Sequence, residues 1–186
     1  MRVSDADILF LPGLGSSGPD HWQTRWEKKL STGRRVEQTD WERPRLHEWT
    51  ARLVEEIART VVAKRPAVLI AHSLGNLVVV HAAPFFAPGQ IAGAYLITPP
   101  SDAAVAALPE IDPDFVPVPM VPLRFPSVLV ASRTDPYGSF GDAEAKAKAW
   151  GSTLVDAGNA GHINSESGHG PWPEGLMRLA TFLKTL

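Results

Sequence analysis

The sequence predicts an α/β fold in which a mostly parallel central sheet of about six strands carries helices on both faces. Short apolar runs alternate with amphipathic stretches along almost the whole chain, which is typical of a parallel sheet covered on both sides. The length agrees, because 186 residues are enough for one well-packed domain and few for two. We therefore expect residues 1–186 to form a single domain.

The first elements follow from local signals. Residues 8–11 are an apolar run closed by a Pro-Gly pair, which predicts a buried strand. Asp20 can cap a helix that continues to about residue 30. Residues 35–39 predict a second strand, and residues 47–63 predict a helix because their apolar side chains recur at helical spacing.

The second part of the chain repeats this alternation of strand and helix. Strands are predicted at residues 67–71, 93–98, 128–132 and 153–155, and helices at residues 74–86, 142–150 and 174–186. A proline-rich segment over residues 99–126 should form neither a regular helix nor a central strand. We expect it to be a long loop that covers a site, because it lies between two strands of the sheet.

Composition excludes several classes of function. The net charge is −2 with no basic block, which argues against nucleic acid as a partner. The chain has no cysteine, so disulfides, thiolate metal sites and a cysteine nucleophile are all excluded. The N-terminus does not resemble a signal peptide, and no run approaches the roughly 18 apolar residues that a membrane span needs. We therefore expect a cytoplasmic protein without a membrane partner.

The most informative segment is Ala-His-Ser-Leu-Gly at residues 71–75. It joins an apolar run too short for a helix to a second apolar segment, with Ser73 between them. A strand that turns sharply into a helix strains the serine backbone, so the residues two positions away on either side must be small. Ala71 and Gly75 satisfy this demand, although the usual pattern has glycine at both positions. Ser73 is therefore a candidate nucleophile.

Two further side chains complete a candidate catalytic set. A serine hydroxyl needs a base to take its proton, and that base needs an acid to orient it. Asp135 follows the strand predicted at residues 128–132, and His162 follows the strand predicted at residues 153–155. Because the carboxyl ends of parallel strands meet at one edge of a sheet, we expect Ser73, Asp135 and His162 to converge there.

The oxygen of an attacked carbonyl needs two backbone N–H donors in place before the charge develops. The N–H of Leu74, at the start of the helix after the serine, is the first candidate. The second should come from the glycine-rich loop over residues 12–18, where the backbone can approach a substrate closely. We select Leu14 as this donor, with Gly15 as the less favoured alternative.

Other residues compete for these roles. His169 is the base if its Gly-rich loop doubles back, whereas His72 and His81 are expected to be structural. The competing acids are Asp102, Asp112, Asp114 and Asp156.

A different function is suggested by the glycine pattern G-x-G-x-x-G at residues 13–18, which is followed by Asp40. This is the layout of a dinucleotide-binding unit. It requires the next helix to begin near the second glycine, whereas Gly18 and Pro19 favour a later start. It also leaves Ser73, Asp135 and His162 unexplained.

Six segments together form a more specific pattern. They are Leu-Pro-Gly at 11–13, Asp-His-Trp-Gln at 20–23, Asp-Trp-Glu-Arg-Pro at 40–44, Ala-His-Ser-Leu-Gly at 71–75, Ser-Arg-Thr-Asp-Pro at 132–136 and Ala-Gly-His-Ile-Asn-Ser-Glu-Ser-Gly-His-Gly-Pro-Trp at 160–172. The chain thereby resembles the small serine hydrolases that include retinoblastoma-binding protein nine and its bacterial relatives. The resemblance implies a compact α/β-hydrolase fold without a large cap, and a triad of Ser73, Asp135 and His162.

The expected function is hydrolysis of a small ester, or of an amide as a peptidase would cleave it, through an acyl-enzyme on Ser73. The partner is then a small-molecule ester or acyl substrate, with no cofactor and no metal required. The alternative is a protein-interaction module that keeps the hydrolase fold with weak or no catalysis.

Overall fold

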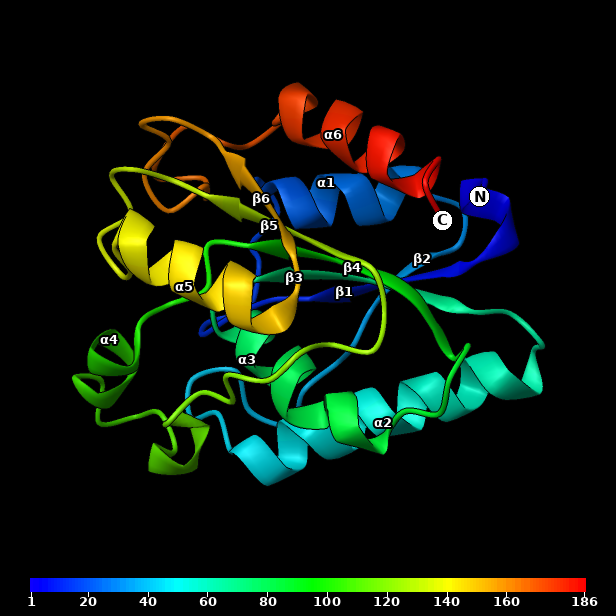
Figure 1. Ribbon diagram of the computed structural model, residues 1–186, viewed down its shortest axis with the longest axis horizontal. Coiled ribbons are helices and arrows are strands. Elements are labelled where there is room, and N and C mark those ends of the chain that lie inside the picture. The colour runs from blue at the N-terminus through cyan, green and yellow to red at the C-terminus, as the bar shows by residue number, and fades with distance from the viewer.

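Six strands form one sheet through the centre of the computed structural model, which describes residues 1–186 (Figure 1). The strands are β1 (Asp7–Leu11), β2 (Gly33–Arg35), β3 (Ala67–His72), β4 (Ile91–Ile97), β5 (Ser127–Ala131) and β6 (Thr153–Asp156). Their order is β2-β1-β3-β4-β5-β6, and every neighbouring pair is parallel. This confirms the parallel sheet that the alternating pattern predicts.

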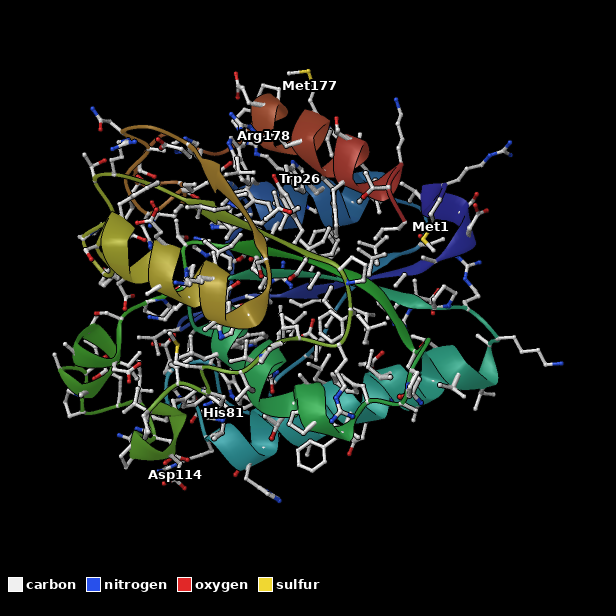
Figure 2. The ribbon with its side chains drawn as sticks, viewed as in Figure 1. Met1, Trp26, His81, Asp114, Met177 and Arg178 are labelled. Atoms are coloured by element: carbon white, nitrogen blue, oxygen red, sulfur yellow. The ribbon has the colours of Figure 1, made fainter.

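Helices cover both faces of the sheet (Figure 1). The helices are α1 (Trp22–Lys29), α2 (Leu46–Val62), α3 (Leu74–Ala82), α4 (Asp102–Ala106), α5 (Phe140–Trp150) and α6 (Pro173–Leu183). One face carries α1 and α6, and the other carries α2, α3 and α5. Figure 2 shows Trp26 on the first side and His81 on the second. No helix combines the length and the apolar character that crossing a bilayer would require.

Two hydrophobic cores lie on the two faces, and the period of two along each strand separates them. On β1, Leu9 and Leu11 belong to the core under α2, α3 and α5, whereas Ile8 and Phe10 belong to the core under α1 and α6. All six residues of β3 are buried. A strand buried on both faces is mostly apolar, as the first five residues of β3 are, which explains the short apolar runs in the sequence.

The chain reverses its direction across the sheet between β1 and β3. From β1 it moves outward to β2, then returns to place β3 on the other side of β1, and β4, β5 and β6 continue from there. In an open parallel sheet the loops on either side of such a switch point separate and leave a crevice at the carboxyl ends of the strands. The loops after β1 and β3 are the two loops on either side of this switch point.

Two predicted boundaries in the first third of the chain are wrong. The helix begins at Trp22, and the side chain of His21, rather than that of Asp20, accepts the N–H of Gln23 as its cap. The second strand covers Gly33–Arg35 rather than residues 35–39, because its register pairs Arg35 with Phe10, one residue before β1 ends.

Two further corrections concern proline-containing segments. Helix α3 ends at Ala82 and continues as a 3₁₀ turn, Ala83–Phe85, because Pro84 has no N–H to continue the helical ladder. The segment 99–126 is not an unbroken loop, since it contains α4 and a 3₁₀ turn, Pro113–Phe115. The Ser101 hydroxyl caps α4 by accepting the N–H of Ala104, 3.1 Å away.

Candidate active site

Ser73 occupies a sharp turn between β3 and α3. Its backbone has φ 53° and ψ −127°, a conformation that an L-residue adopts only under strain. Gly75 explains why the turn needs a small residue after the serine: a Cβ at this position would lie 2.2 Å from the carbonyl oxygen of Leu11. On the other side of the turn, Ala71 is completely buried.

A buried amide that the sequence analysis did not single out, Asn76, holds this turn against β4. Its Nδ2 donates to the carbonyl oxygens of Ser73 (2.9 Å) and Ile97 (2.7 Å), and its Oδ1 accepts the N–H of Ile97 (3.1 Å). The one signal in the sequence that points to Asn76 is its polar amide within the otherwise apolar first turn of α3. Asn76 therefore links the carbonyl of the strained serine to β4, and the serine N–H also donates directly to the Ile97 carbonyl at 3.1 Å.

Asp135 and His162, predicted from separate strand ends, meet at the same edge of the sheet. His162 Nδ1 and Asp135 Oδ1 are 2.9 Å apart, and both side chains are less than a tenth exposed. The N–H of Tyr137 donates to the same carboxylate oxygen at 3.0 Å. This contact assigns the ring proton to Nδ1 and leaves Nε2 free to accept a proton.

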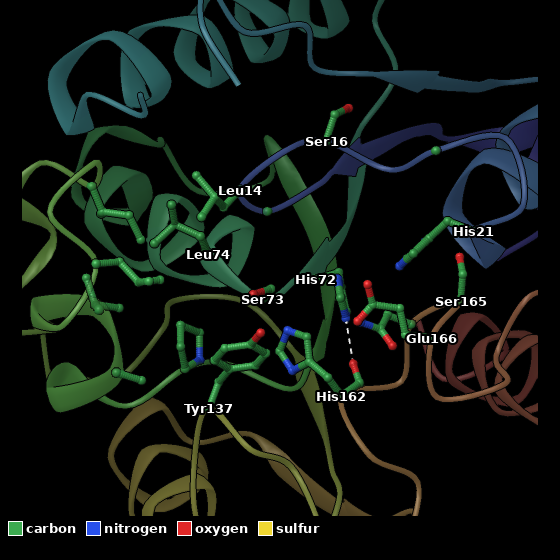
Figure 3. Close-up of a pocket in the computed structure, with 18 residues that line it drawn as sticks. Leu14, Ser16, His21, His72, Ser73, Leu74, Tyr137, His162, Ser165 and Glu166 are labelled. Atoms are coloured by element: carbon green, nitrogen blue, oxygen red, sulfur yellow. Dashed lines mark hydrogen bonds between the residues drawn. The ribbon is translucent and has the colours of Figure 1, made fainter. Parts of the chain in front are cut away.

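Figure 3 shows the His162 ring facing Ser73, and both residues line one cavity. The structure has no hydrogen bond between the two side chains, and proton transfer from Ser73 requires Nε2 of His162 to come within hydrogen-bond reach of its hydroxyl.

The loop that carries His162 is tied to three other elements. The carbonyl oxygen of His162 accepts from His72 Nε2 (2.8 Å) and from Thr98 Oγ1 (3.2 Å). The next carbonyl, that of Ile163, accepts from Trp22 Nε1 at 2.8 Å. Ile163 has φ 48°, which is unusual for a β-branched residue, so these contacts hold a strained loop in place.

His72 has the structural position expected of it. Burial, assisted by the nearby rings of His162 and His21, keeps the pKa of His72 well below its usual range. The neutral ring carries its proton on Nε2, where it meets the His162 carbonyl. His81 likewise contacts a backbone carbonyl, that of Phe115, at 3.1 Å.

The loop after β1 approaches Ser73 closely. A Cβ on Gly13 would lie 2.8 Å from the Ser73 Cβ and 3.1 Å from the Leu74 nitrogen. The N–H of Gly15 donates to the Trp41 carbonyl at 2.9 Å, whereas the N–H of Leu14 has no partner within the chain. Leu14 and Leu74 both line the cavity with Ser73, whereas the N–H of Gly15 is already used in its bond to Trp41.

The competing residues have other partners. His169 Nδ1 lies 3.2 Å from the Ser167 hydroxyl, and Asp156 forms an ion pair with Arg133 at 2.7 Å. The other three acids lie in segment 99–126, where Asp112 and Asp102 accept backbone N–H groups and Asp114 is exposed. None of these side chains contacts the His162 ring.

The glycine pattern at residues 13–18 does not lead directly into a helix. Helix α1 begins at Trp22, several residues after the last glycine, so its N-terminus does not coincide with the loop as a dinucleotide site requires. The carboxylate of Asp40 accepts the N–H groups of Glu42 and Arg43 in a local turn. No group of three His, Asp or Glu side chains is arranged to hold a metal ion.

The cavity beside Ser73 and His162 has a volume of about 400 Å³. Its apolar lining comes from Leu14, Leu74 and the proline-rich segment, which contributes Val105, Leu108 and Ile111. Its polar lining includes His21, Ser165 and Glu166. In Figure 3, Leu14 and Leu74 lie on one side of Ser73, and His21, Ser165 and Glu166 lie on the other. The proline-rich segment, which the sequence predicts to cover a site, therefore contributes to the lining of this cavity.

Comparison with known sequences and structures gives a consistent result. A family model described as serine hydrolase matches residues 8–181. A structure described as a YdeN-like hydrolase from Pectobacterium atrosepticum is 36% identical, with a TM-score of 0.85 over 98% of this chain and 94% of that one. No curated protein matches the chain.

More distant structures share the fold. The ydeN gene product from B. subtilis is 17% identical, with a TM-score of 0.77 over 96% of this chain and 99% of that one. Esterase 2 from Thermogutta terrifontis is 16% identical, with a TM-score of 0.72 over 100% of this chain and 85% of that one. A second structure of that esterase is phosphonylated by cyclosarin.

Proposed function

This chain belongs to the serine hydrolase family, and we propose that it cleaves small carboxylic esters through an acyl-enzyme formed on Ser73. The observation that carries the proposal is the hydrogen bond between Asp135 and His162, 2.9 Å long, with His162 lining the same cavity as the strained Ser73. Ser73 and His162 line one cavity, and Asp135 is hydrogen-bonded to His162, which together fit the requirements of a serine nucleophile.

In the first half-reaction, Ser73 Oγ attacks the carbonyl carbon of the ester while His162 Nε2 takes the hydroxyl proton. Asp135 holds the imidazole in the required tautomer and stabilises the imidazolium that forms. The carbonyl oxygen becomes an oxyanion, which the N–H groups of Leu74 and Leu14 bind. The C–O bond to the alcohol then breaks, and His162 gives its proton to the departing oxygen.

In the second half-reaction, water attacks the acyl carbon and His162 takes a proton from it. The bond to Ser73 Oγ breaks, the hydroxyl recovers its proton from His162, and the carboxylic acid leaves. Every proton is returned, so these residues need no cofactor or metal for the cycle.

The size and lining of the cavity indicate a short acyl chain. A volume of about 400 Å³ lies at the low end of small-molecule sites, and it must hold both halves of the ester. The apolar residues Val105, Leu108 and Ile111 form the side of the cavity suited to the acyl group. A cytoplasmic location stays a prediction from the sequence.

A series of p-nitrophenyl esters of two, four, eight and twelve carbons tests this proposal. We expect the highest kcat/KM on the short chains and loss of at least about 10³-fold in Ser73→Ala. Butyryl p-nitroanilide in the same assay compares the amide, which we expect to be cleaved more slowly. Ester cleavage that survives Ser73→Ala, in a variant that is folded by circular dichroism, would contradict the proposal.

A further inference from the structure

His21 places an unused hydrogen-bond donor at the polar side of the cavity. The residue is only 6% exposed, yet it lines the cavity with Ser73 (Figure 3). Its Nδ1 accepts the N–H of Gln23 as the cap of α1, 3.2 Å away, so a neutral ring carries its proton on Nε2. That Nε2 has no hydrogen-bond partner within the chain.

The ring of His21 is fixed in both charge and orientation. Burial, with the His162 ring and the Arg35 guanidinium nearby, lowers the pKa of His21 to about 4, so the ring is neutral at physiological pH. It packs between the rings of Trp22 and His72, with centroids 5.3 and 4.9 Å away. The chain thus presents an uncharged N–H donor in the cavity that also holds the candidate nucleophile.

Glu166 supplies a hydrogen-bond acceptor on the same side of the cavity as His21. It is exposed, lines the cavity and forms no ion pair or hydrogen bond within the chain. Ser165 lies next to it, and Figure 3 shows both residues near His21, away from Leu14 and Leu74. This side therefore offers a donor and an acceptor that the protein itself leaves without partners.

We propose that the side of the cavity formed by His21, Ser165 and Glu166 binds the leaving group, and that it selects an alcohol bearing further hydroxyl groups, as in a glycerol ester. This inference rests on the proposed ester hydrolysis at Ser73 and adds the class of alcohol. The acyl group then lies toward Leu14, Leu74 and the proline-rich segment.

A polyol matches both groups because each hydroxyl both donates and accepts. Its oxygen can accept the Nε2–H of His21, and its proton can be donated to the Glu166 carboxylate. An apolar alcohol would displace water from both groups without replacing their hydrogen bonds, which sites of this kind disfavour. A quaternary ammonium would suit Glu166 and leave the His21 donor unpaired.

The test compares two butyrate esters that share the acyl group and the three-carbon leaving group. Monobutyrin has two free hydroxyls, and n-propyl butyrate has none. The measured quantity is the ratio of their kcat/KM values, and comparing this ratio between variants cancels the intrinsic reactivity of each ester. His21→Asn keeps a side-chain oxygen to cap α1 while it removes the Nε2 donor. Glu166→Gln removes the charge, and Glu144→Gln, an exposed residue on α5, is the matched control.

We expect the monobutyrin preference to fall about tenfold in His21→Asn and in Glu166→Gln, as the loss of one hydrogen bond predicts, and to stay constant in Glu144→Gln. An unchanged ratio in both variants would overturn the inference. So would a wild-type preference for butyrylcholine that Glu166→Gln abolishes, because it would assign this side to a cation.

Hydrolysis of p-nitrophenyl butyrate, compared between wild type and Ser73→Ala, separates the inference from the function on which it rests. If Ser73-dependent cleavage is present and the monobutyrin ratio does not respond to the variants, only the leaving-group assignment fails. If wild type cleaves none of these esters, the proposed function fails and the assignment falls with it.

Discussion

At the scale of single residues, the surroundings of His162 determine what its ring can do. Asp135 binds Nδ1, and the carboxylate is itself held by the N–H of Tyr137. The ring of Tyr137 packs edge-on against the imidazole, 4.6 Å between centroids. These contacts restrict both tautomer and rotation, so Nε2 is the nitrogen available to Ser73.

Asp135→Asn tests this arrangement. An amide cannot reproduce the charge that stabilises the imidazolium, and it permits the wrong tautomer of His162. We expect kcat on p-nitrophenyl butyrate to fall by about 10⁴-fold with little change in the thermal midpoint. A loss of less than tenfold in the folded variant would mean that Asp135 does not orient the base.

The sequence predicts which residues converge at the site more completely than it predicts what holds them. Ser73, Asp135 and His162 each follow a predicted strand, and parallel strands must end at one edge. Asn76 and Gln23 could not be assigned in this way. Gln23 Nε2 donates to the carbonyls of Leu11 and Ile70, and such contacts between distant segments leave no local pattern.

At the scale of elements, the site depends on how closely α3 approaches the end of β1. The Gly75 backbone lies against the carbonyl oxygens of Leu11 and Pro12, where no side chain fits. The same approach brings the loop after β1 over Ser73, with Gly13 as the contact. The two glycines therefore set the spacing between the serine and the candidate oxyanion donors.

Gly75→Ala should disrupt this spacing. The new methyl group would overlap the Leu11 carbonyl, and overpacking against backbone of this kind destabilises by about 3 kcal/mol. Gly141→Ala, in the first turn of α5, is the control and should be neutral or stabilising, because a Cβ there would meet only the Ser139 Oγ, at an ordinary contact distance of 4.0 Å. Urea unfolding of both variants measures the difference in the free energy of unfolding. Equal stabilities would show that the close contact between Gly75 and the Leu11 carbonyl does not exclude a side chain.

The wrongly predicted elements have two separate causes. The strand at residues 35–39 has a suitable pattern, but β1 ends at Leu11 and offers no partner beyond it. Helix α4 is five residues long and fits between prolines, so the composition of segment 99–126 concealed it. Apart from α4, element types were predictable from pattern, whereas boundaries depended on neighbouring strands and on caps.

At the scale of the whole molecule, the burial of two neutral histidines beside the site makes the stability of the fold depend on pH. The pKa of His21 falls from 6.5 to about 4 on folding, and that of His72 falls in the same direction. Below pH 6.5 these two histidines bind protons in the unfolded chain but remain neutral in the folded chain until the pH is much lower. The free energy of unfolding should therefore decrease as the pH falls from 6.5 toward 4.

Urea unfolding at pH 7 and pH 5 measures this effect. For His21 alone we expect a loss of about 2 kcal/mol between these values, at about 1.4 kcal/mol per pH unit. His21→Asn should reduce the loss, and the exposed His47→Asn should retain it. Stability that does not decrease toward pH 5 in wild type would contradict the burial of neutral rings.

The most direct test of the account is labelling of the purified protein with a fluorophosphonate probe, because only an activated serine reacts. We expect wild type to be labelled, and labelling to be lost in Ser73→Ala and in His162→Ala. Labelling that persists in Ser73→Ala, or its absence in correctly folded wild type, would contradict the claim that Ser73 is the nucleophile of this hydrolase.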